Sequence, residues 1–116
     1  MPRYTSGLSE NLTLPNGNYD FTVLAATLKN SKNSSEMIEL VLEFPEGVRV
    51  WDNLVFVNKA FWKIDQFRES IGETLLPGEE VEINPSDLLG RTGKASLITE
   101  TWEGKDRNRI GSYIKA

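Results

Sequence analysis

The stretch EMIELVLEF at residues 36–44 decides the fold, because its side chains alternate strictly in character. The apolar side chains that share one parity are Ile38, Leu40, Leu42 and Phe44. A period of two is the pattern of a β-strand with one buried face. The stretch therefore predicts a strand whose even-numbered side chains face a core.

Turn signals flank this strand on both sides. Pro45-Glu46-Gly47 leads into a second alternating run over 48–57, so the two runs predict a hairpin. Upstream, a polar loop over 30–35 follows a long strand over 18–29, which itself follows the turn LPNG at 14–17. Past Leu24 this strand becomes apolar on both faces, as expected for a strand that bends through a closed barrel.

The period changes to that of a helix over 58–71. Asn58 is a candidate N-cap and Gly72 a candidate stop. The side chains predicted to form the apolar face are Ala60, Phe61, Ile64, Phe67 and Ile71. One further helical turn is predicted over 84–90, and two strands, over 93–102 and 107–115, form a last hairpin.

Three strands, one helix and two strands are the order of an OB-fold. We therefore predict an all-β protein with one α-helix, built as a five-stranded OB-fold barrel with the helix between strands three and four. A chain of 116 residues holds one such core. Residues 14–116 are expected to form this single domain, and residues 1–13 an N-terminal arm.

Composition removes several kinds of chemistry. The chain has no cysteine and no histidine, which excludes thiol nucleophiles, zinc sites built on these residues and Ser-His-Asp triads. It also lacks a glycine-rich phosphate loop, so we expect no enzyme activity, no metal and no cofactor. A magnesium-dependent nuclease on the acidic edge at Glu36, Glu39, Glu43 and Glu46 is a third, weaker reading. No apolar stretch could span a membrane or start a secretory signal, so a cytoplasmic protein is expected.

Charge is unevenly distributed along the chain. Residues 1–90 carry 7 basic and 14 acidic side chains, whereas residues 91–116 carry 6 basic and 3 acidic ones. An acidic body argues against coating duplex DNA by bulk charge, but a locally basic end permits a directional nucleic-acid site. The alternative is a solvated face without function.

The strand over 48–57 offers a site for base stacking. If Val48 and Val50 point inward, then Arg49, Trp51 and Asn53 point outward. An exposed tryptophan beside an arginine is what unpaired bases stack on. The alternative is a bulge near Asp52 that turns Trp51 into the core.

The last hairpin offers a cationic face. Arg107, Arg109, Tyr113 and Lys115 share one parity, and Ile110 and Ile114 share the other. Trp102 and Lys105 lie at the hairpin turn, where Trp102 either stacks on a base or packs. Lys32 lies in the other loop that flanks the groove of an OB-fold. Trp62 lies opposite the apolar helix face, and a structural role is favoured for it.

Four strings together resemble a known family. They are LPNGNY at 14–19, WDNL at 51–54, the segment 59–72 that begins KAFWKI, and GKDRNRI at 104–110. In order and spacing they resemble a phage and prophage family catalogued as a domain of unknown function (number 669), which is linked to phage single-stranded DNA-binding proteins with an OB-fold. The resemblance covers about residues 14–114.

The resemblance and the residues predict the same function. We expect a protein that binds single-stranded DNA largely without sequence preference, in replication or recombination, in the cytoplasm of a host cell. The predicted DNA-binding residues are Lys32, Arg49, Trp51, Lys94, Trp102, Lys105, Arg107, Arg109 and Tyr113. RNA binding, a homodimer and contacts to phage replication or recombination proteins are left open, and no membrane contact is expected. The competing reading is an OB-like module that binds a phage recombination protein or a host protein.

Overall fold

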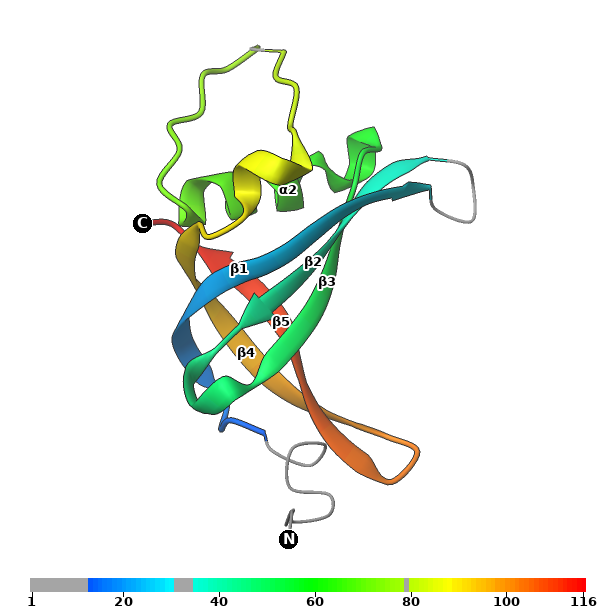
Figure 1. The fold of residues 1–116 in the computed structure, drawn as a ribbon, viewed down its shortest axis with the longest axis vertical. Helices are drawn as coiled ribbons and strands as arrows, with labels where there is room; N and C mark the ends of the chain where they lie inside the picture. The colour runs from blue at the N-terminus through cyan, green and yellow to red at the C-terminus, as the bar shows by residue number, and fades with distance from the viewer. Residues whose placement is uncertain (1–12, 31–34, 79) are drawn as a thin grey trace, which may run out of the picture.

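The structure, a computed structural model, describes residues 13–30, 35–78 and 80–116 (Figure 1). The elements in these ranges follow in the order β1 (Gly17–Asn30), β2 (Glu36–Glu43), η1 (Pro45–Gly47), β3 (Arg49–Val55), η2 (Asn58–Ala60), α2 (Phe61–Ser70), η3 (Pro85–Leu88), β4 (Thr92–Trp102) and β5 (Lys105–Ile114). The predicted order of three strands, one helix and two strands is confirmed. Of the predicted arm, only Thr13 lies within the described residues.

The strands form one antiparallel sheet in the order β3-β2-β1-β4-β5. β1 pairs with β4 through residues 17–22 and with β2 through residues 22–30, and its register shifts at Leu24. Such a shift bends a strand and increases its twist, so the sheet curls. β5 returns beside β3, which makes the sheet a nearly closed barrel (Figure 1). The prediction of a five-stranded OB-fold barrel is confirmed.

The helix α2 covers one end of this barrel (Figure 1). Ile64, Phe67 and, just after the helix, Ile71 are buried, as their helical spacing predicted. Gly72, with a φ of 92°, follows the helix as predicted. The prediction that Asn58 caps the helix is wrong, because Asn58 begins the 3₁₀ turn η2 and no side chain caps α2.

The core is centred on four aromatic rings, three from β1, α2 and β5 and one, Phe44, just after β2. Phe21 of β1 packs against Phe44, Phe67 and Tyr113 with ring-centroid distances of 5.9, 6.2 and 5.9 Å. The rings of Phe67 and Tyr113 meet edge to face at 5.2 Å. Offset and edge-to-face pairs contribute beyond their buried area, so this cluster fixes how α2 and β5 sit on β1.

Gly93 allows β4 to approach this cluster closely. An added Cβ at this position would lie 2.7 Å from Cζ of Phe21 and 2.7 Å from the carbonyl oxygen of Ser70. Neither atom can move freely, since Phe21 is 2% exposed and Ser70 is in the last turn of α2. Only glycine therefore fits between β1 and the end of the helix.

We predict that Gly93→Ala lowers the free energy of unfolding by about 1–3 kcal/mol, because an overpacked core must shift its backbone or its side chains. The measurement is urea unfolding followed by circular dichroism. Gly17→Ala is the control, since the nearest atom to its added Cβ is at 3.7 Å. Equal unfolding midpoints for the two variants would contradict the packing argument.

Candidate nucleic-acid interface

Trp51 lies on the solvent-facing side of β3. Its side chain is 61% exposed, whereas Val50 and Leu54 on the opposite parity are buried. β3 pairs with β2 from Arg49 to Val55 without a register shift. The alternative of a bulge that turns Trp51 into the core is therefore wrong, and the predicted exposure of this ring is confirmed.

Trp51 ends a row of outward side chains that crosses three strands. Its partner on β2 is Val41, and the partner of Val41 on β1 is Ala25. Side chains that face each other across strands lie roughly 5 Å apart, so these three form a continuous apolar strip. Arg49 and Asn53 flank Trp51 on the same strand and are exposed. The strip offers a flat surface with a guanidinium on one side and an amide on the other.

Asp52 explains why the alternation of β3 continues without a break. It points inward among apolar neighbours, and both of its oxygens have donors. The Tyr113 hydroxyl donates to Oδ2 at 2.5 Å, and Lys63 Nζ donates to Oδ1 at 2.6 Å. Lys63 also donates to the carbonyl oxygen of Asn53 at 3.0 Å. A paired carboxylate can stay on the inner parity, so Trp51 beside it stays on the outer one.

The phenol of Tyr113 is held in its protonated form. Burial raises the pKa of Tyr113 well above its ordinary value of 10.0, and the charge and hydrogen bond of Asp52 raise it further. The hydroxyl is therefore a donor to Asp52 at neutral pH. This contact joins β3 to β5 at the point where the barrel closes.

The position of Tyr113 corrects one of the predictions. Its ring is 5% exposed and belongs to the core, so the expectation that it shares the outward face of Arg107 and Arg109 is wrong. The reason is a register shift in the last hairpin: Ser96 pairs with Ser112, and the next residue of β4, Leu97, pairs with Ile110. Gly111 is the extra residue, and one extra residue exchanges inward and outward positions for the rest of the strand.

The cations that precede this bulge share one outward face of the hairpin. Arg109 pairs with Ile98, Arg107 with Glu100 and Lys105 with Trp102, and these alternate positions project to the same side. Arg107, Arg109 and Lys105 are exposed. The prediction that the two arginines lie on one face is confirmed, and Lys105 joins them.

β3 and β5 come together at the closure of the barrel. The sheet pairings make β3 and β5 run in the same direction, and Asp52 lies against Tyr113. On β3, Arg49 precedes Asp52 by three residues. On β5, Arg109 precedes Tyr113 by three paired positions, because the extra residue Gly111 has no partner on β4. Both arginines therefore project outward roughly 10 Å along their strands from the same contact.

Carboxylates already pair with several of these cations. Nε of Arg107 and Nε of Arg109 each lie 2.9 Å from an oxygen of Glu100. Lys29 on β1 pairs with Glu39 on β2 at 2.9 Å. Among the residues that the structure describes, Arg49 and Lys105 form no ion pair within 4.0 Å. Glu39 and Glu43 keep the outer face of β2 acidic, in contrast to β5.

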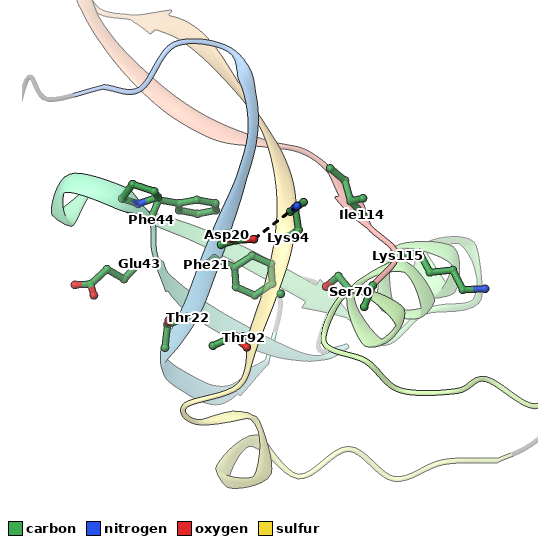
Figure 2. Close-up of a pocket in the computed structure, with 13 residues that line it drawn as sticks. Asp20, Phe21, Thr22, Glu43, Phe44, Ser70, Thr92, Lys94, Ile114 and Lys115 are labelled. Atoms are coloured by element: carbon green, nitrogen blue, oxygen red, sulfur yellow. Dashed lines mark ion pairs between the residues drawn. The ribbon is translucent and has the colours of Figure 1, made fainter.

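Lys94 lies apart from the other predicted cations. It is four residues from Ile98 along β4, roughly 13 Å, and its Nζ is 3.9 Å from Asp20. Figure 2 shows Asp20 and Lys94 pointing toward each other at the rim of an open pocket of about 790 Å³. Phe21 and Gly93 are among the residues that line it. The structure therefore places Lys94 beside Asp20, apart from Arg107 and Arg109.

Two predicted residues fall outside this geometry. Lys32 lies in the segment 31–34, outside the described residues, and the side chain of Trp102 is likewise outside the described part. In Figure 1 β1 and β2 extend beyond the barrel at the upper right, and the β4–β5 hairpin extends beyond it at the lower right.

Trp62 is exposed on another part of the molecule. Its side chain is 60% exposed, at the start of α2. The adjacent Phe61 is 46% exposed, so the prediction that Phe61 belongs to the buried helix face is wrong. Trp62 projects from the side of the helix opposite to the buried Ile64 and Phe67. Trp62 is therefore not part of the barrel core, and the structural role favoured for it stays a prediction.

Sequence reasoning missed Lys63 as the residue that supports the site. The available signal was Asp52 itself, because a carboxylate on the inner parity of an apolar strand needs a donor. The residue type was thus predictable, but the position was not, since it depends on how α2 lies across β3.

No helix within the described ranges is long and apolar enough to cross a membrane. No protein-family model matches this sequence, and no curated protein matches it significantly.

We predict that Tyr113→Phe lowers the free energy of unfolding by about 1.5–3 kcal/mol, because it leaves a largely buried carboxylate without one of its donors. The measurement is denaturant unfolding at pH 7. Tyr19→Phe is the matched control, because the Tyr19 hydroxyl donates to the carbonyl of Pro15 at an exposed position. A loss for Tyr113→Phe no larger than for Tyr19→Phe would refute the role given to this contact.

Proposed function

We propose that the chain is a phage-type single-stranded DNA-binding protein that binds unpaired DNA largely without sequence preference. The observation that carries this proposal is the exposed ring of Trp51 on β3, next to the closure beyond which the exposed cations of β5 lie. Its role would be to protect unpaired DNA in the host cytoplasm during replication or recombination.

Stacking supplies the contact to the bases. A base laid on Trp51 would extend over Val41 and Ala25, which lie in register with it. Every base has an aromatic face, so this contact does not depend on sequence. The nearby Asn53 adds an amide that can donate to or accept from any base edge.

Charge sets the side on which the phosphates run. Glu43 on the outer face of β2 repels phosphate, and Glu39 is offset by Lys29. The cations Arg49, Lys105, Arg107 and Arg109 attract it. The DNA backbone would therefore run along the side of β3 and β5, with the bases turned toward β2. An acidic body with one basic face also disfavours nonspecific wrapping of duplex DNA.

We predict that Trp51→Ala weakens binding of an oligo(dT) by about 5- to 100-fold, which corresponds to the roughly 1–3 kcal/mol lost per stacked base. The measurement is fluorescence anisotropy of a labelled oligonucleotide at constant salt. Trp62→Ala is the matched control, because Trp62 is equally exposed at 60% but lies on the outer side of α2. If both variants bind like the parent protein, or lose affinity equally, stacking on Trp51 is excluded.

We predict that changing Arg107 and Arg109 together to Ala reduces the slope of log K against log salt by about 1.4, since each phosphate neutralised on a single strand contributes about 0.7. The slope is measured by titration at several salt concentrations. Lys115→Ala is the control, because Lys115 lies near Glu69 of α2, beyond the bulge. An unchanged slope in the double variant would show that phosphates do not contact this face.

A second candidate function is an OB-like module that binds a phage recombination protein or a host protein. The exposed pair Phe61 and Trp62 favours it, because large apolar side chains side by side on a helix often mark a protein contact. Pull-down of a partner that survives nuclease treatment, together with no oligonucleotide binding, would favour this candidate.

Comparing oligo(dT) with oligo(U) tests whether the 2′-hydroxyl matters.

A further inference from the structure

Glu100 bridges the two arginines of the hairpin in the structure. Its Oε1 accepts from Nε of Arg107 at 2.9 Å, and its Oε2 forms an ion pair with Nε of Arg109 at 2.9 Å. Glu100 and Arg107 are direct partners across the β4–β5 ladder, and Arg109 is the next outward residue. One carboxylate thus engages both guanidinium groups from the centre of the cationic face.

This geometry is the one that a phosphate group would adopt. A phosphodiester presents two anionic oxygens, and guanidinium groups bind carboxylates and phosphates in the same planar manner. Glu100 therefore occupies the position on Arg107 and Arg109 that the DNA backbone would take. A strand that binds there must displace the carboxylate.

The displacement is easy because the ion pairs are exposed. The side chains of Arg107 and Arg109 are 59% and 54% exposed, and that of Glu100 is 35% exposed. Exposed pairs of this kind contribute little to stability, since water and salt screen them. The same carboxylate still lowers the local charge of the pair of arginines from +2 to +1.

We propose that Glu100 is a built-in competitor of phosphate that holds Arg107 and Arg109 in the free protein and weakens single-stranded DNA binding. This inference rests on the proposed function and concerns its regulation. A binding site weakened in this way exchanges its contacts readily, which lets the protein release a strand that a replication or recombination enzyme must use. A merely positioning role for Glu100 predicts the opposite sign, because loss of the carboxylate would then disorder the arginines and reduce affinity.

The test is Glu100→Gln, which keeps the size of the side chain and removes its charge. At low salt we expect oligo(dT) affinity to rise about two- to tenfold, the range of exposed charge pairs. Glu103→Gln is the matched control, because Glu103 lies at the turn of the same hairpin and its removal changes the net charge by the same amount.

A second background separates the contact from general electrostatics. In the protein that already carries Arg107→Ala and Arg109→Ala, Glu100 has no guanidinium group left to hold. Glu100→Gln should then change the affinity no more than Glu103→Gln does. A gain of equal size in both backgrounds would overturn the proposal. So would a loss of affinity in Glu100→Gln, or an effect equal to that of Glu103→Gln in the parent protein.

These outcomes are distinguishable from failure of the proposed function. If the parent protein binds oligo(dT) with salt dependence, the proposed function stands and the Glu100 variants decide only the competition. If neither the parent protein nor Glu100→Gln binds oligo(dT) at low salt, single-stranded DNA binding itself is excluded and the inference falls with it.

Discussion

The hydrogen-bonded carboxylate of Asp52 is the interaction on which the rest of the structure depends. It accepts from Tyr113 on β5 and from Lys63 on α2, and so ties together three elements that are far apart in the sequence. The β3–β5 closure is the joint of an OB-like barrel where β-ladder pairing gives way to side-chain contacts. The largely buried carboxylate of Asp52 must keep its hydrogen-bond donors. This requirement fixes the position of β5 along β3.

The position of the candidate binding surface follows from this closure. With Asp52 turned inward, its neighbours Trp51 and Asn53 must face solvent, and with Tyr113 inward the bulge at Gly111 turns Arg109 outward. The contact between Asp52 and Tyr113 thus fixes which side chains of β3 and β5 face solvent. The acidic side chains of β2 lie on the other side of Trp51, so the charge of this surface differs on the two sides of the ring.

The sequence allowed the fold and the aromatic half of the site to be predicted. The alternation over 36–44 and the return to the same parity in the next strand were sufficient to place Trp51 outside, because the β2–β3 ladder has no shift. The same counting failed for Tyr113, since one glycine bulge reverses parity and the sequence alone does not show where it occurs. Long-range partners such as Lys63 for Asp52, or Glu100 for two arginines, depend on strand and helix placement that local pattern does not contain.

The three tryptophans allow the central claim to be tested in one experiment. Their indole N–H groups give three separate signals in a nitrogen–proton NMR spectrum of the labelled protein, each assigned with a Trp→Phe variant. The account predicts that titration with oligo(dT) shifts or broadens the Trp51 signal while the Trp62 signal stays in place. A titration that shifts Trp62 and leaves Trp51 unchanged, or that shifts neither, would contradict it.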